Sequence, residues 1–153
     1  MRLLKLLFAF QGRIGRLKYW LGYCSWVVIG ALVYFMLKVV VAATKIDENA
    51  VLFWGLGLFL LWPFLVSATA INLRRLHDRE KSGWWLLAFY LIPTALMVIA
   101  QITVGSKPDS SMTKVGQYGS LAIYFWMIIE LGFLPGTRGR NEYGDDPVAS
   151  QPK

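Results

Sequence analysis

The sequence is poor in the residues that form disulfides and metal sites. In 153 residues it has one cysteine, Cys24, and one histidine, His77. A single cysteine excludes an intrachain disulfide, and inside an apolar segment it more commonly packs as a small apolar group than reacts. One histidine and one cysteine argue against a zinc or haem site built within one chain. We therefore expect no metal and no cofactor.

Charged residues are also scarce, at 16% of the chain against about 25% in an ordinary soluble domain, while 56% of the residues are hydrophobic. Residues 51–73 and 84–104 contain no charged residue at all. At about 1.5 Å rise per residue, a helix over either segment is long enough to cross a hydrocarbon core of about 30 Å. Both segments are therefore predicted to be transmembrane helices.

Two more apolar segments each carry one charge. Residues 19–43 contain only Lys38, which lies near the end of the segment, where a lysine can reach the interface. Residues 118–134 contain only Glu130. Together with the two uncharged segments, they predict an all-α polytopic membrane protein with four transmembrane helices.

The segments between these helices are short, and none is long enough to fold as a separate soluble domain. In residues 1–18, leucines and phenylalanines surround Arg2 and Lys5, a pattern typical of a short helix in the cytoplasmic interface. A secretory signal is the competing interpretation, but the apolar run is too short and basic residues follow it in place of a small-residue cleavage site. We expect one membrane domain over 1–153, with a cytoplasmic tail at 135–153.

The basic residues indicate an orientation, because they gather at alternate ends of the four segments. Four of them lie in or near the first and third loops, namely Lys38, Lys45, Lys107 and Lys114. The other twelve lie at the opposite ends, namely Arg2, Lys5, Arg13, Arg16, Lys18, Arg74, Arg75, Arg79, Lys81, Arg138, Arg140 and Lys153. By the positive-inside bias, both termini and the middle turn are predicted to be cytoplasmic. The formal charge of +7 is then largely a topology signal, so we expect attraction to anionic lipid headgroups and no nucleic-acid binding.

Three predicted cytoplasmic segments, 12–16, 72–78 and 136–141, combine arginine with turn-forming residues. In a four-helix bundle with cytoplasmic termini they share one rim, and arginine binds phosphate or carboxylate through two parallel hydrogen bonds. We predict a site for an anionic headgroup there, made of Arg13, Arg16, Arg74 and Arg75, with Asp78 orienting them and Asn72 and Asn141 as neutral donors. The alternative is that these arginines only set the topology and pair with Asp78, Glu80, Glu142 and Asp145.

Glu130 is a buried charge that needs an explanation. It is expected about one helical turn inside the cytoplasmic boundary, where an unpaired carboxylate is costly and a partner is expected. The partners expected to reach it are Arg13, Arg16, Arg74, Arg75 or Asn72. A structural pair is favoured over a transport residue, because a proton or ion relay would show further ionisable groups at other depths.

The His77-Asp78 pair suggests acid and base catalysis, or the paired ligands of a metal phosphohydrolase. Both activities need more partners than one histidine supplies. We expect instead that Asp78 accepts hydrogen bonds from the arginines or from backbone amides in the turn that leads to Trp84. The sequence also lacks a phosphate-binding Lys-Ser or Lys-Thr loop and a complete dinucleotide loop.

Three motifs in order along the chain resemble a known family. They are Phe10-Gln11-Gly12-Arg13-Ile14-Gly15-Arg16-Leu17-Lys18-Tyr19-Trp20, then Arg74-Arg75-Leu76-His77-Asp78 with Ser82-Gly83-Trp84-Trp85, then Gly136-Thr137 with Asn141-Glu142-Tyr143-Gly144 and Pro147. They are similar to the signatures of the small bacterial inner-membrane proteins typified by YhaH and YhaI, catalogued as domain of unknown function eight hundred and five. The resemblance implies a four-helix bacterial inner-membrane protein and supplies no activity. It favours a constructed rim over scattered topology charges.

From these patterns we predict a non-enzymatic integral inner-membrane protein whose Arg-rich cytoplasmic rim binds anionic lipid or a partner protein, as a single chain or a homo-oligomer. The first alternative is a component of an oligomeric channel or transporter that uses Glu130. The second is a membrane enzyme that acts on phospholipid with His77 and Asp78.

Overall fold

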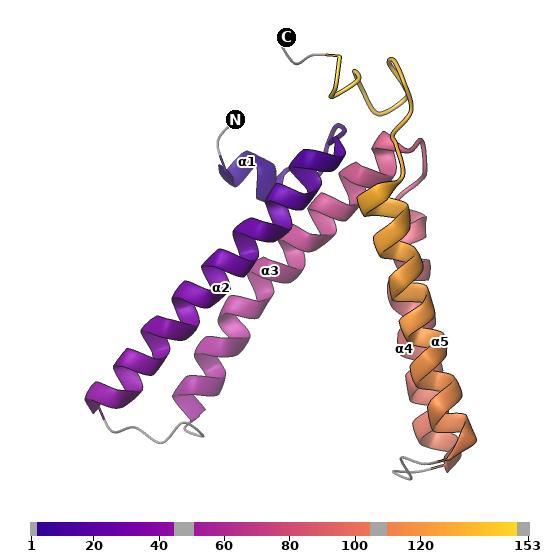
Figure 1. The fold of residues 1–153 in the computed structure, drawn as a ribbon. Helices are drawn as coiled ribbons and strands as arrows, with labels where there is room; N and C mark the ends of the chain where they lie inside the picture. The colour runs from indigo at the N-terminus through magenta and orange to yellow at the C-terminus, as the bar shows by residue number, and fades with distance from the viewer. Residues whose placement is uncertain (1–2, 45–50, 105–109, 150–153) are drawn as a thin grey trace. The chain divides into compact units, whose positions relative to one another are not determined.

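The computed structural model describes residues 3–44, 51–104 and 110–149, and these ranges are helical except for their turns and the C-terminal segment (Figure 1). The elements are α1 (Leu3–Phe8), α2 (Arg16–Thr44), α3 (Val51–Asp78), α4 (Trp84–Val104), α5 (Ser111–Ile128) and the π-helical turn η1 (Ile129–Phe133). Within these ranges no strand forms, apart from one isolated bridge between Asn141 and Gly144. The all-α class is confirmed. Arg2, Lys45, Lys107 and Lys153 of the charge count lie outside the described residues.

Among the residues that the structure describes, two helices are long and apolar enough to cross a membrane, by length and composition. They cover Arg16–Ala43 and Trp84–Thr103, with mean hydropathies of 2.3 and 2.0. They correspond to the first and third of the predicted segments. Four crossings stay a prediction.

Of the four apolar segments, only 84–104 matches its helix at both ends. Helix α4 has the bounds predicted for 84–104, whereas α3 continues past residue 73 to Asp78 and α5 begins at Ser111 instead of residue 118. Hydropathy marks the apolar part of a helix and not its polar turns, which are the last turns of α3 and the first turns of α5. The Ser110 hydroxyl caps α5 by accepting a hydrogen bond from the Thr113 amide at 3.1 Å.

The described residues form two compact units, and α3 contributes to both, through residue 71 to the first and from residue 72 to the second. The single membrane domain expected from the sequence stays a prediction. In the first unit, Trp26 of α2 makes edge-to-face contacts with Phe8 of α1 and Phe64 of α3. Its indole N–H donates a hydrogen bond to the Ser67 hydroxyl at 2.8 Å. A short helix at the N-terminus is therefore present, packed through Trp26.

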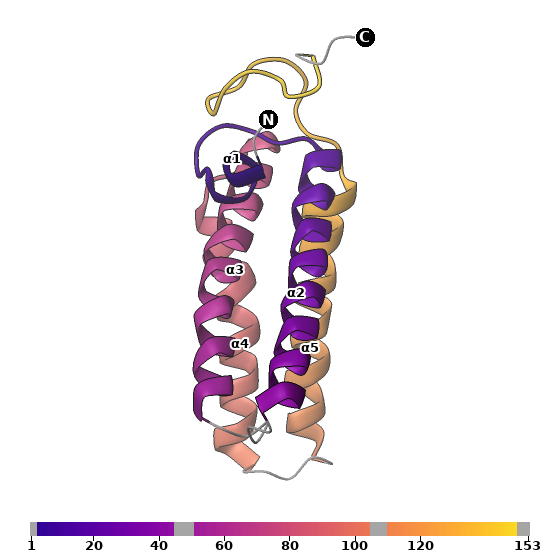
Figure 2. The same cartoon turned by 90° about the vertical axis from the view of Figure 1, so that its left-hand side faces the viewer.

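In the second unit, α4 and α5 lie antiparallel and side by side (Figures 1 and 2). Small residues let them approach closely: a Cβ at Gly116 would lie only 3.1 Å from the Leu96 carbonyl oxygen and 2.8 Å from the Ala100 Cβ. One helical turn on, the buried Ser120 hydroxyl donates to the Pro93 carbonyl at 2.9 Å.

Helix α3 ends in a turn that reverses the chain within the second unit. The Glu80 amide donates to the His77 carbonyl at 3.1 Å, and the Lys81 amide donates to the Leu76 carbonyl at 2.9 Å. This pattern is the Schellman motif, in which one residue takes a left-handed conformation that glycine usually supplies. Glu80 takes it here, with φ of 59°. The turn directs the residues after Asp78 back toward the end of η1.

Candidate functional site

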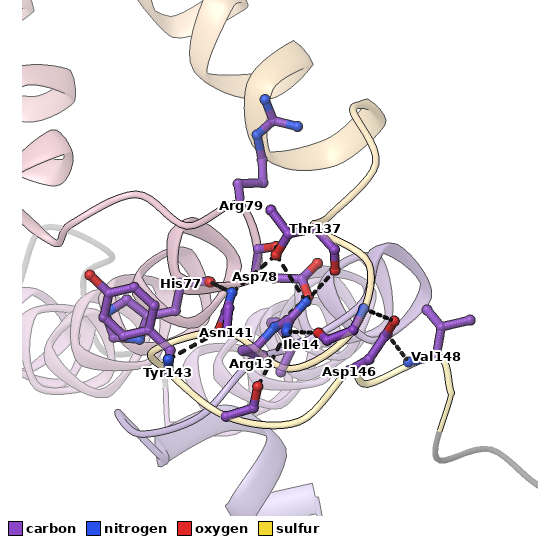
Figure 3. Close-up of polar contacts among 12 residues, drawn as sticks. Arg13, Ile14, His77, Asp78, Arg79, Thr137, Asn141, Tyr143, Asp146 and Val148 are labelled. Atoms are coloured by element: carbon purple, nitrogen blue, oxygen red, sulfur yellow. Dashed lines mark hydrogen bonds and ion pairs between the residues drawn. The ribbon is translucent and has the colours of Figure 1, made fainter.

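Asp78, the last residue of α3, is the centre of a buried ionic cluster (Figure 3). Its Oδ1 accepts a hydrogen bond from Arg13 Nε at 3.1 Å, and its Oδ2 is paired with Arg75 Nη1. Its backbone carbonyl accepts from the Thr137 amide at 2.8 Å. Gly136 lies so close that a Cβ there would overlap the Asp78 carboxylate. The prediction that arginines donate to Asp78 is confirmed, and we call Arg13, Arg75 and Asp78 the Asp78 triad.

Arg13 joins residues 11–16 to the C-terminal segment of the same unit. Besides Asp78, its Nη1 donates to the Gly139 carbonyl at 2.6 Å and to the Gly144 carbonyl at 3.2 Å. Its Nη2 donates to the Thr137 carbonyl at 2.5 Å and to the Thr137 hydroxyl at 3.2 Å. The side chain is only 1% exposed. Because all three guanidinium nitrogens donate internally, Arg13 acts as a brace in this structure.

Arg75 is fully buried and holds the end of η1. Its Nε donates to the Leu131 carbonyl at 2.7 Å, and its Nη2 donates to the Leu134 carbonyl at 2.5 Å. An α-helix would pair the Leu131 carbonyl with the amide of residue 135, but Pro135 has no N–H to donate. The arginine replaces that missing donor and places a positive charge at a helix C-terminus, where it is favourable.

The two acidic groups near this cluster have opposite pKa shifts. Burial raises the pKa of the Asp78 carboxyl, although the charges of Arg75 and Arg13 act in the opposite direction. The pKa of the Asp146 carboxyl is lowered, because the backbone amides of Val148 and Gly139 donate to it at 2.8 and 3.0 Å. The arginines therefore offset only part of the effect of burial on the pKa of Asp78, while the loop amides stabilise the charged form of Asp146.

Asn141 and His77 extend the cluster beyond Thr137. Asn141 Nδ2 donates to the His77 carbonyl at 2.9 Å and to the Thr137 hydroxyl at 3.0 Å, and its Oδ1 accepts from the Tyr143 amide at 2.9 Å. The His77 ring stacks on the Tyr143 ring, with centroids 4.0 Å apart and planes 3° from parallel (Figure 3). Its Nδ1 is buried with no hydrogen-bond partner in the described part of the chain. Burial lowers the pKa of His77, and a hydrogen bond to the Gly12 backbone partly reverses this shift.

Glu130 lies in η1 and is 5% exposed. Its Oε1 accepts from Arg79 Nε at 2.8 Å and from Lys81 Nζ at 2.6 Å. The Lys81 ammonium also lies 4.5 Å from the centre of the Trp85 ring. The prediction that Glu130 has a cationic partner is confirmed, but neither partner was among those we expected. The Schellman turn explains the difference, since it brings the residues after Asp78 back to η1.

The other residues of the predicted headgroup site have different surroundings. Asn72 Nδ2 donates to the Tyr90 hydroxyl at 2.9 Å, and Arg74 is 2% exposed. Arg16 is exposed and donates through Nη1 to the Phe133 carbonyl at 3.2 Å. Of the seven predicted residues, Arg13, Arg75, Asp78 and Asn141 are therefore the ones that the structure gathers into one internal cluster.

An open cavity of about 450 Å³ lies beside the Asp78 triad. Its charged lining residues are Arg16, Arg75, Arg138, Asp78 and Asp146. The sequence placed 136–141 on the predicted rim, but the predicted headgroup site did not include Arg138, Gly136 or Thr137. The Gly136-Thr137 motif was a signal that could have found the last two, because both lie against Asp78.

Long apolar helices, with polar segments that buried arginines hold together, are the features of a small helical membrane protein. Residues 7–145 match the family described as "Protein of unknown function (DUF805)", and the chain belongs to this family. The resemblance identified from the three motifs is confirmed.

The chain is similar to three proteins of Escherichia coli (strain K12). "Uncharacterized protein YiiR" is 34% identical over 140 residues, which cover 92% of this chain and 86% of YiiR. "Inner membrane protein YhaH" is 27% identical over 149 residues, covering 96% of this chain and 93% of YhaH. "Inner membrane protein YhaI" is 27% identical over 139 residues, covering 90% and 85%. No solved structure matches the chain.

Proposed function

We propose that this chain is a multi-pass inner-membrane protein whose cytoplasmic rim binds anionic lipid. The observation that carries the proposal is the gathering of three arginine-bearing segments, 11–16, 72–81 and 129–146, around Asp78 in one unit, with Arg16 and Arg138 left exposed. Basic groups next to a membrane-crossing helix attract the anionic lipids of the cytoplasmic leaflet.

Four membrane crossings, by α2, α3, α4 and α5 with η1, form the first part of the proposal. Helix α2 carries apolar side chains that are largely exposed, including Val27 at 72% and Leu32 at 60%, which suits contact with lipid tails. Helix α3 has 28 residues, about 42 Å at 1.5 Å per residue, which exceeds a hydrocarbon core. The names of YhaH and YhaI support the inner membrane as the location.

The topology is tested with a reporter that is active only in the cytoplasm. Fusion after Lys153 or within 79–82 should give signal, and fusion near Asp47 or Asp109 should not. Asp47, Asp109 and Lys153 lie outside the described residues. A periplasmic C-terminus would overturn the orientation, and with it the cytoplasmic rim.

Lipid binding is tested by native mass spectrometry of the full chain extracted in mild detergent. We expect phosphatidylglycerol or cardiolipin to remain bound at higher occupancy than phosphatidylethanolamine from the same membrane. Equal retention of all three lipids would contradict the proposal. The same spectra report the number of copies in the particle.

The contacts support this proposal over its two alternatives. The channel alternative depends on Glu130, and Arg79 and Lys81 both bind that carboxylate, as expected of a structural pair. The enzyme alternative depends on His77 and Asp78, and the Asp78 carboxylate is occupied by Arg13 and Arg75. The proposed role is therefore non-enzymatic.

A further inference from the structure

The three arginines that line the cavity beside the Asp78 triad differ in how many of their guanidinium nitrogens already donate hydrogen bonds. Arg75 contributes to the lining, but its Nε, Nη1 and Nη2 all donate to groups within the unit. Arg16 donates through Nη1 alone, to the Phe133 carbonyl at 3.2 Å. For Arg138, none of the contacts found among the described residues is a hydrogen bond or an ion pair. Arg16 and Arg138 therefore have guanidinium edges available to a ligand.

The two acidic side chains on the lining are already occupied. Both oxygens of Asp78 are paired with the buried arginines of the triad. In Asp146, Oδ2 accepts from the Gly139 amide at 3.0 Å, and Oδ1 accepts from the Val148 amide at 2.8 Å. These contacts leave Asp78 and Asp146 poorly placed to bind a cation or to neutralise the two exposed arginines.

The charge balance of the cavity favours an anion. Its lining carries three arginines and two aspartates, and Arg13 directly behind Asp78 adds one more positive charge. Two positive charges are therefore uncompensated, and they belong to the two arginines that have open donors. Two guanidinium groups that each form a pair of charge-assisted hydrogen bonds are suited to a phosphate, which presents several acceptor oxygens.

We propose that this cavity binds a phosphate group between Arg16 and Arg138, with the Asp78 triad as its rigid floor. The inference deepens the proposed lipid-binding function and rests on it for the lipid source of the phosphate. The volume of about 450 Å³ is within the range of small-molecule sites, so it admits a phosphate together with the group that bears it. The shared chemistry is a phosphate oxyanion, carried by a lipid headgroup or by a free phosphate compound.

The test uses the purified full chain in detergent and the double variant Arg16→Gln/Arg138→Gln. The matched control is Arg140→Gln, because Arg140 is 84% exposed, lies off the cavity and contacts only Asp145 at 3.8 Å among the described residues. Two ligands are titrated at constant ionic strength: inorganic phosphate, with sulfate as the competing anion, and short-chain phosphatidylglycerol, with phosphatidylcholine as the neutral reference. Thermal unfolding of each protein without ligand verifies that the variants are folded.

The double variant should bind the phosphate-bearing ligand at least about tenfold more weakly than the parent, and Arg140→Gln should bind like the parent. Arg16→Lys/Arg138→Lys should not restore the affinity, because an ammonium cannot make the two-pronged contact. Equal affinity in the parent and the folded double variant would overturn the phosphate site. Equal losses in the double variant and in Arg140→Gln would also overturn it, since they would reveal a general charge effect.

The two ligands separate this inference from the proposed function. Binding of inorganic phosphate that depends on Arg16 and Arg138, without retention of phosphatidylglycerol, would support the site and contradict the lipid function. Retention of phosphatidylglycerol that is equal in the parent and the double variant would support the lipid function and overturn the site. Loss of phosphatidylglycerol in the double variant alone would support both and identify the headgroup as the source.

Discussion

Asp78 and Glu130 are two buried carboxylates of one unit, and each accepts hydrogen bonds from two cations. Their surroundings differ. Asp78 binds Arg13 and Arg75, whose side chains are 1% and 0% exposed. Glu130 binds Arg79 and Lys81, whose side chains are 17% and 26% exposed. A buried arginine that loses its carboxylate cannot be solvated by water. A partly exposed arginine or lysine can turn toward water or lipid headgroups instead. The number of ion pairs is thus a poorer guide to stability than the exposure of the partners.

Asp78→Ala should have the largest effect. It leaves Arg13 and Arg75 as uncompensated buried charges, so we expect the free energy of unfolding to fall by about 3–5 kcal/mol. Thermal unfolding of the purified protein in detergent measures the change. The control is Asp145→Ala, since Asp145 is 86% exposed and its arginine partner is equally accessible. Similar small losses in both variants would show that the Asp78 triad is not under the constraint described above.

Gly136→Ala is the second largest change expected. Its new methyl group would overlap the Asp78 carboxylate and approach the Asp78 carbonyl, so the triad would have to shift, at about 2–3 kcal/mol. Gly30→Ala is the control, because nothing lies within 4 Å of a Cβ there and alanine favours a helix. An unchanged melting temperature for Gly136→Ala would mean that Asp78 can move, which contradicts its role as a fixed centre.

Glu130→Ala should cost less than either change, about 1–2 kcal/mol, because Arg79 and Lys81 can turn outward when the carboxylate is removed. The same unfolding experiment should show a clear decrease relative to the exposed Glu142→Ala. If Glu130→Ala were as damaging as Asp78→Ala, the contrast between the two carboxylates would be wrong. If it matched Glu142→Ala, the ion pairs of Glu130 would contribute nothing measurable.

His77 should give the smallest effect, and only in acid. Burial lowers its pKa in the folded protein, so below its ordinary value of about 6.5 the unfolded chain takes up a proton that the folded chain resists. Stability should therefore be unaffected by this group at neutral pH and should decrease as the pH falls through about 6.5. The melting temperature of the parent should fall more than that of His77→Gln between about pH 7.5 and 5.5. Parallel curves would show that His77 is as accessible to protons folded as unfolded.

The sequence predicted the parts of this fold that depend on composition. Residues 84–104 lack charge, and α4 has those bounds. The need for a partner at Glu130 followed from the cost of burying a carboxylate, but Arg79 and Lys81 did not follow, since they depend on a turn in which Glu80 takes a left-handed conformation. A glutamate carries no signal for that geometry.

The site was predicted in its location and only partly in its contacts. Charge patterning identified the arginines of residues 12–16 and 72–78, but it could not tell which of them would donate to backbone carbonyls. Arg13 and Arg75 do so because several carbonyls at the end of η1 and in the C-terminal segment converge on them. Arg138 was placed on the rim but left out of the predicted headgroup site, because its place on the cavity depends on the path of the loop after Pro135.

The π-helical turn η1 changes the direction in which the residues after it face around the helix axis. The Leu134 amide donates to the Ile129 carbonyl, five residues back, at 3.2 Å, so this turn holds one residue more than α-helical pairing would. One residue corresponds to a rotation of about 100° around a helix axis. Two groups of this turn, the Glu130 carboxylate and the Leu131 carbonyl, are bound by Arg79 and Arg75. Relatives that lengthen or shorten this stretch by one residue would keep its hydropathy and lose its alignment, so here the length of the chain carries information that its composition does not.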